Sequence, residues 1–115
     1  MKKVALFAFN GEEMCFVHVL LNALDFHDQG YETRIVLEGA AVKLVPRLAA
    51  DGSPLKGLFA KCRDAGLVAG VCLACAKKLG TFEATEQLGL PLLGDMANHA
   101  GMAPFTDQGY QVITF

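Results

Sequence analysis

The chain contains the stretch Val71-Cys72-Leu73-Ala74-Cys75-Ala76-Lys77-Lys78-Leu79-Gly80, in which we expect a buried strand to be followed by a helix. The apolar run from Leu67 to Leu73 predicts the strand, and Cys72 stands where that strand should end. Cys75 stands where the helix should begin, and two lysines follow one turn later. Thiols at a helix start or beside lysine are more acidic than free cysteine, because positive charge favours the thiolate. The stretch therefore predicts a reactive-sulfur site.

Runs of apolar or β-branched residues predict four further strands, at 4–9, 33–37, 90–93 and 110–115. The first run does not alternate with polar residues, which is typical of a strand covered on both faces in a parallel sheet. Pro91 near the start of the fourth run indicates an edge strand. The orientation of the last strand is left open by the sequence.

Helical patterns separate these strands, at residues 11–28, 42–50, 54–65, 82–88 and 96–102, with a loop at 104–109. Asn10 is expected to cap the first helix, with Glu13 as its reciprocal partner. The inner stripe of this helix is predicted at four positions with helical spacing, widened by three more: Met14, Val17, Leu21 and Leu24, then Phe16, Leu20 and Ala23.

Strands that alternate with helices predict an α/β layered domain around a mostly parallel five-stranded sheet, with residues 1–115 forming one domain. In such a sheet the loops that follow the strands share one edge, and ligands bind there. Besides Cys72 and Cys75, we therefore expect binding residues at this edge, namely Asn10, Glu12, Glu38, Gly39, Lys77, Asp95 and His99. His99 could shuttle a proton at neutral pH, although a surface or capping role explains it equally well.

The composition excludes several classes of function. A net charge of −2 with scattered basic residues gives no surface for nucleic acid or an anionic membrane. No secretory signal or membrane-spanning run is apparent, so a cytoplasmic protein with reduced cysteines is expected. Hydrophobic residues make up 53% of a small chain, more than one small core can bury, which predicts a homo-oligomer.

Cys72 and Cys75 form a Cys-x-x-Cys pair, close enough in sequence to share a metal or a disulfide, or for one to carry a persulfide. Two cysteines alone do not complete a tetrahedral zinc site, and no second ligand pair stands elsewhere, so no cofactor or metal is predicted. The plainer alternative is that both are small core residues, since free cysteine is often buried and inert.

The chain resembles the DsrE/DsrF-like family of small sulfur-relay proteins, which includes the TusD-like sulfurtransferase subunits. Three segments carry the resemblance: Val4-Ala5-Leu6-Phe7 before a long helix, Val36-Leu37-Glu38-Gly39-Ala40-Ala41-Val42, and Val71-Cys72 leading through Cys75 to Gly80. The resemblance implies a three-layer α/β/α sandwich that assembles as a dimer, trimer or hexamer. It also implies that Cys72 carries a persulfide and that Cys75 is the second cysteine of some members. The apolar Leu73-Ala74 between them departs from family members that have glycine or polar residues there.

These observations predict a cytoplasmic sulfur-relay protein, which carries sulfane sulfur on Cys72 between donor and acceptor proteins. Whether it is an enzyme of the sulfurtransferase kind is left open. The alternatives are a non-catalytic subunit or small-ligand-binding module with the same fold, and a thiol-redox or metal site formed by Cys72, Cys75 and His99.

Overall fold

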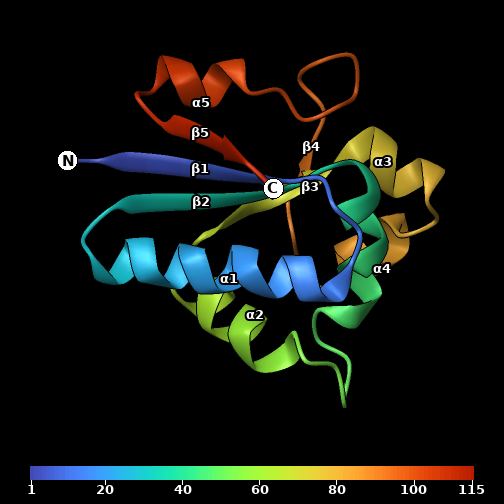
Figure 1. The fold of residues 1–115 in the computed structure, drawn as a ribbon. Helices are drawn as coiled ribbons and strands as arrows, with labels where there is room; N and C mark the ends of the chain where they lie inside the picture. The colour runs from blue at the N-terminus through green and yellow to red at the C-terminus, as the bar shows by residue number, and fades with distance from the viewer.

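The computed structural model describes residues 1–115 as one five-stranded sheet with helices packed around it (Figure 1). The strand order is β4-β3-β2-β1-β5, and every neighbouring pair is parallel, including β5 with β1. The strands are β1 Lys3–Ala8, β2 Glu32–Leu37, β3 Val68–Cys72, β4 Leu92–Leu93 and β5 Gln111–Thr114. The prediction of an α/β sandwich around a five-stranded sheet is therefore confirmed, and the last strand is parallel.

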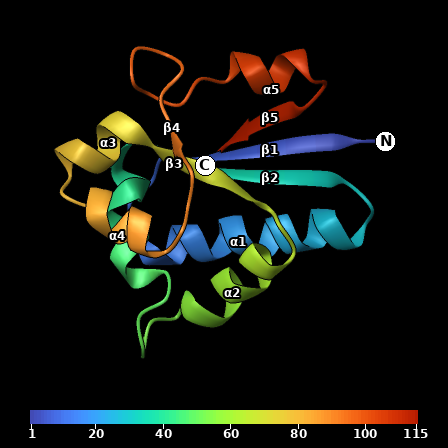
Figure 2. The same cartoon turned by 180° about the vertical axis from the view of Figure 1, so that it is seen from behind.

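The helices form a layer on each side of the sheet. The long helix α1 and helix α2 cover one face, whereas the short helix α5 lies over the other face beside β5 (Figures 1 and 2). Helices α3 and α4 lie beyond the carboxyl end of β3 together with a 3-10 helix, η1. Their bounds are α1 Glu13–Asp28, η1 Gly39–Arg47, α2 Lys56–Asp64, α3 Leu73–Lys78, α4 Phe82–Gln87 and α5 Ala103–Asp107. None of them combines the length and hydropathy that a membrane-spanning helix needs.

The core lies between the sheet and helices α1 and α2. Residues Val4 to Ala8 of β1 are all buried, as the continuous apolar run predicts for a central parallel strand. Phe59 and Cys62 of α2 pack into the same core, where the Cys62 thiol donates a 3.7 Å hydrogen bond to the carbonyl of Leu20. Burial of this apolar surface is the main term that stabilises the arrangement.

Helix α1 begins later than predicted, and the face that it buries is a different one. It starts at Glu13, and Asn10 accepts a hydrogen bond from the amide of Glu12 at 2.9 Å instead of capping the helix. The predicted inner stripe is wrong, because Met14 and Leu21 are 72% and 46% exposed. The buried residues are Phe16, Val19, Leu20 and Ala23, three of which the sequence had placed only at the margin of that stripe.

The exposed apolar residues of α1 indicate where two copies of the chain would meet. The homo-oligomer itself stays a prediction. Met14 and Leu21 are seven residues apart, so they lie on one helix face. If that face is covered by another copy, light scattering of the wild type will give a multiple of the 12.3 kDa chain mass. Replacing both by glutamate is expected to return the mass to one chain, whereas Gln87→Glu at an exposed polar position of α4 should leave it unchanged. A wild type that scatters as a single chain at micromolar concentration would contradict this prediction.

The segment after β4 is not the helix predicted at 96–102. It forms a tight turn in which Met96 and His99 exchange backbone hydrogen bonds of 2.9 and 2.8 Å. Ala97 and Asn98, at the tip, have φ of 49° and 70°, in the left-handed region that few non-glycine residues adopt. The helix of this region, α5, lies instead at Ala103–Asp107, where the sequence predicted a loop.

Strand β4 approaches β3 very closely at Gly70. A Cβ atom added to Gly70 would lie 2.6 Å from the backbone oxygen of Pro91 and 2.8 Å from Cγ of Leu93. The amide of Val71 donates a 2.9 Å hydrogen bond to that same oxygen of Pro91. The absence of a side chain at residue 70 thus allows the edge strand to pair with β3 just before Cys72.

Candidate functional site

The register of the sheet places Glu38 beside Cys72. Leu37 at the end of β2 pairs with Val71 of β3, so the residue that follows each of them lies at the same carboxyl edge. Cys72 is the last residue of β3 and pairs in turn with Leu93 of β4. The predicted gathering of residues at the edge where parallel strands end is therefore seen here.

Helix α3 begins directly after Cys72 and brings Cys75 back toward it. Cys72 is the N-cap residue of this helix, and Cys75 lies within its first turn. The amide of Ala74 donates a 2.8 Å hydrogen bond to the carbonyl of Asn98, which fastens the turn after β4 onto the start of α3. This contact joins two segments that are far apart in sequence and determines where His99 lies.

His99 completes the site from that turn. Its Nδ1 atom lies 3.4 Å from Sγ of Cys72 and 3.8 Å from Sγ of Cys75, and a hydrogen bond joins the ring nitrogen to each sulfur. Non-glycine residues with positive φ are uncommon and concentrate at functional sites. The left-handed Ala97-Asn98 pair holds the imidazole against both thiols.

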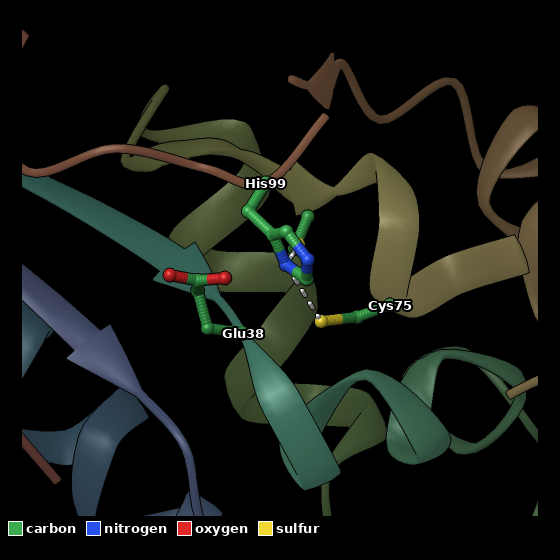
Figure 3. A group of neighbouring side chains, drawn as sticks. Glu38, Cys75 and His99 are labelled. Atoms are coloured by element: carbon green, nitrogen blue, oxygen red, sulfur yellow. Dashed lines mark hydrogen bonds between the residues drawn. The ribbon is translucent and has the colours of Figure 1, made fainter. Parts of the chain in front are cut away.

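The four side chains of Glu38, Cys72, Cys75 and His99 form one cluster. One ligand atom from each lies within 4.8 Å of all the others. Figure 3 shows the Glu38 carboxylate, from the end of β2, and the Cys75 sulfur, from helix α3, directed toward the His99 ring. Glu38 is 6% exposed and makes no salt bridge. The cluster therefore holds a buried carboxylate beside two thiols and an imidazole.

Cys72 is not the partly ionised thiol that the sequence predicts. Its side chain is fully buried, and burial raises its pKa to about 12. Hydrogen bonding to the Cys75 and Glu38 side chains acts in the same direction, whereas the backbone amides of Cys75 and Ala100 lower the pKa. Burial outweighs the amides because the thiolate loses its hydration inside the protein.

Cys75 is the accessible thiol of the pair. It is partly exposed and borders a hollow of about 370 Å³. The other residues that line this hollow are Gly39, Ala40, Lys43, Lys78, Leu79 and His99. A small reactant can reach Cys75 from solvent through this hollow, and two of the residues that line it are lysines.

Lys77 is placed differently from the prediction that it would favour a thiolate. Its ammonium group lies 5.5 Å from the centroid of the Phe82 ring, and it borders other surface hollows but not the one beside Cys75. Lys78 takes that position because it follows Cys75 by three residues and so shares its helix face. The helical spacing could have identified Lys78, but Lys43 comes from η1 and no local pattern indicates it.

The remaining predicted binding residues are outside the cluster. Asn10 and Glu12 are exposed and form the turn before α1, and neither lines the hollow beside Cys75. Asp95 supports the turn after β4 by accepting a 3.1 Å hydrogen bond from the amide of Gly101. Gly39 lines the hollow through its backbone. Of the seven predicted binding residues, the structure thus brings Glu38, Gly39 and His99 to the thiols.

Comparisons with known proteins identify the family of this chain. Residues 3–115 match the DsrE/DsrF-like family, so the chain belongs to that family, which is associated with sulfur relay. An uncharacterized protein of Methanocaldococcus jannaschii is 34% identical over 97 residues, which cover 84% of this chain and 77% of that protein. An uncharacterized protein of Archaeoglobus fulgidus is 40% identical over 52 residues, which cover 45% of this chain and 84% of that protein.

A solved structure of another protein has the same fold. It is a conserved protein of unknown function from Bacteroides thetaiotaomicron, which superposes with a TM-score of 0.74 over 99% of this chain and 95% of that chain. The sequence identity is 17%, so this likeness concerns the architecture alone.

Proposed function

We propose that this protein is a cytoplasmic sulfur-relay protein that receives sulfane sulfur as a persulfide on Cys75. The observation that carries the proposal is the pairing of an accessible thiol with an imidazole, 3.8 Å apart, at the border of an open hollow. Membership of the DsrE/DsrF-like family supports the same chemistry. The family resemblance implied Cys72 as the carrier, but the burial of Cys72 favours Cys75 as the thiol that meets a donor.

The transfer step conserves electrons and needs no external oxidant. The Cys75 thiol gives its proton to Nδ1 of His99, and the thiolate attacks the outer sulfur of the donor's persulfide. The donor's sulfur–sulfur bond breaks, the donor thiolate leaves, and the imidazolium returns the proton to it. The product is a persulfide on Cys75, which an acceptor thiolate can take by the same kind of exchange.

The residues around Cys75 suit an anionic sulfur chain. Lys43 and Lys78 line the hollow and place positive charge near the persulfide, which is ionised more readily than a thiol. In the proposed setting of the cytoplasm, thiols stay reduced. All four cysteines of the structure are free, so no structural disulfide competes for Cys75.

Mass spectrometry after incubation with a persulfide donor tests the proposal. The wild type is expected to gain about 32 Da, the mass of one sulfur atom, in a reductant-sensitive adduct. Cys75→Ser is expected to abolish the adduct, and His99→Ala to slow its formation by about 10²-fold or more, the usual contribution of a general base. Cys15→Ser, which changes a partly exposed thiol outside the site, is the matched control.

Two outcomes would contradict the proposal. A wild type that gains no adduct would remove the sulfur-carrying function altogether. An adduct that persists in Cys75→Ser and disappears in Cys72→Ser would return the carrier role to the buried thiol.

A further inference from the structure

We infer that this protein has a tetrahedral site for a thiophilic divalent cation, with zinc as the best fit, formed by four side chains: Glu38, Cys72, Cys75 and His99. The inference does not rest on the proposed sulfur transfer, although the two would use the same thiols. A cation bound between both sulfurs would hold Cys75 away from a sulfur donor.

The donor set selects the class of cation. Two cysteine sulfurs, a histidine nitrogen and a carboxylate oxygen are the three ligand types that zinc accepts in proteins. Magnesium and calcium prefer sites made of oxygen alone, so a site with two thiolates disfavours them. The sequence predicted no metal in its leading interpretation and offered a metal site of Cys72, Cys75 and His99 only as an alternative. The register of the sheet adds Glu38 to that set as a fourth ligand.

The distances already approach those of a bound site. Zinc–sulfur and zinc–nitrogen bonds of about 2.3 and 2.1 Å in a tetrahedron place pairs of ligand atoms about 3.3–3.8 Å apart. Nδ1 of His99 lies 3.4 and 3.8 Å from the two sulfurs, and no pair of ligand atoms in the cluster exceeds 4.8 Å. Side-chain adjustments of about 1 Å would therefore complete the coordination shell.

Glu38 contributes the carboxylate of the cluster. The residue is 6% exposed, no salt bridge in the structure includes it, and its side chain hydrogen-bonds with that of Cys72. A buried carboxylate is costly unless a cation or hydrogen-bond donors compensate its charge. A divalent cation at the centre of the cluster would offset two of the three negative charges that Glu38 and the two thiolates carry together.

The cluster supplies four protein ligands from three segments of the chain. Because all four positions are filled by the protein, the site resembles closed sites that hold a metal more than open sites that bind a reacting water.

Titration with Co²⁺ tests the inference with a readout that does not require activity. The reduced wild type is expected to bind one equivalent of Co²⁺, to give the intense visible bands of a tetrahedral site and thiolate-to-cobalt charge transfer, and to release the cobalt when Zn²⁺ is added. His99→Ala and Cys75→Ser should each weaken binding by about 10-fold or more. Cys15→Ser is the control, because this thiol is outside the cluster and should leave both spectrum and affinity unchanged.

Separate readouts distinguish the inference from the proposed function. Glu38→Gln is expected to lower Co²⁺ affinity by about 10-fold or more. The Co²⁺ bands report metal binding and the adduct of about 32 Da on the metal-free wild type reports sulfur loading, so either can fail while the other succeeds. Circular dichroism of each variant checks that it folds. The inference is overturned by a wild type that gives no tetrahedral spectrum with equimolar Co²⁺, or by bands that persist when Cys72 and Cys75 are both replaced by alanine.

Discussion

At about pH 7.5, iodoacetamide is expected to alkylate Cys72 of the folded protein about a thousandfold more slowly than a cysteine of the unfolded chain. Alkylation requires the thiolate, and burial raises the pKa of Cys72 from 9.0 to about 12. Three pH units correspond to about a thousandfold smaller thiolate fraction. The rate should rise about tenfold for each unit of pH until the pH approaches that pKa. Timed labelling with site-resolved mass spectrometry measures the rate.

The other cysteines provide the controls for this experiment. Cys75, which borders the hollow, should be alkylated much faster than Cys72 in the folded state. Cys62 is also fully buried, and burial raises its pKa to about 11, so it should be slow as well. In denaturant the sites should react at similar rates. Folded Cys72 that reacts as fast as the unfolded chain would show that the sulfur reaches solvent and would remove the reason for preferring Cys75.

Gly70→Ala is expected to lower the free energy of unfolding by about 1–3 kcal/mol, the usual cost of overpacking a well-packed site. The added Cβ would lie 2.6 Å from the backbone oxygen of Pro91, which cannot rotate away as a side chain can. Either β4 separates from β3 or the peptide at Pro91 shifts, and both weaken the pairing next to Cys72. The midpoint of urea unfolding measures the loss, with an unchanged slope indicating that the unfolded state is the same.

Gly57→Ala is a matched control with the opposite sign. Gly57 lies in helix α2, and a Cβ added there meets no atom within 4 Å. Alanine in a helix is favoured over glycine by about 0.5–1 kcal/mol, because glycine loses more conformational freedom on folding. Equal stability of the Gly70 variant and the wild type would contradict the close approach of β4 and β3.

The order of strands and helices could be predicted because each strand is an apolar run bounded by turn residues. The run from Val4 to Phe9 has no polar position, and this fits the full burial of β1 in a parallel sheet. Once the sheet is parallel, the strand ends share one edge. Cys72, Glu38 and His99 could therefore be assigned to that edge without any contact being known.

The inward face of α1 could not be predicted because the helix has apolar residues on two faces. Met14 and Leu21 have the same spacing as the buried set Phe16, Leu20 and Ala23. Hydropathy does not distinguish a face packed on the sheet from one left at the surface. Only the packing of the whole domain selects between them.

The ionisation of Cys72 was mispredicted for a related reason. The local signals, a helix start and two lysines, favour a thiolate, but the burial that opposes it comes from segments distant in sequence. The turn that carries His99 could not be predicted either, because Met96 and Ala97 are good helix formers and favour a helix there. Only Asn98 tolerates the left-handed conformation well. Local propensity was overridden there by the hydrogen bond from Ala74 to Asn98.

The side chains of the site come from three segments of the chain, which lie at or after the ends of β2, β3 and β4. This has a consequence for the newly made protein. Synthesis proceeds from the N-terminus, so Glu38 and both cysteines leave the ribosome before His99 does. Until the turn after β4 has docked, the two thiols and the carboxylate lack the imidazole of His99. A nascent or misfolded chain thus lacks the complete cluster, so the sulfur loading and metal binding proposed above would both report that folding is complete.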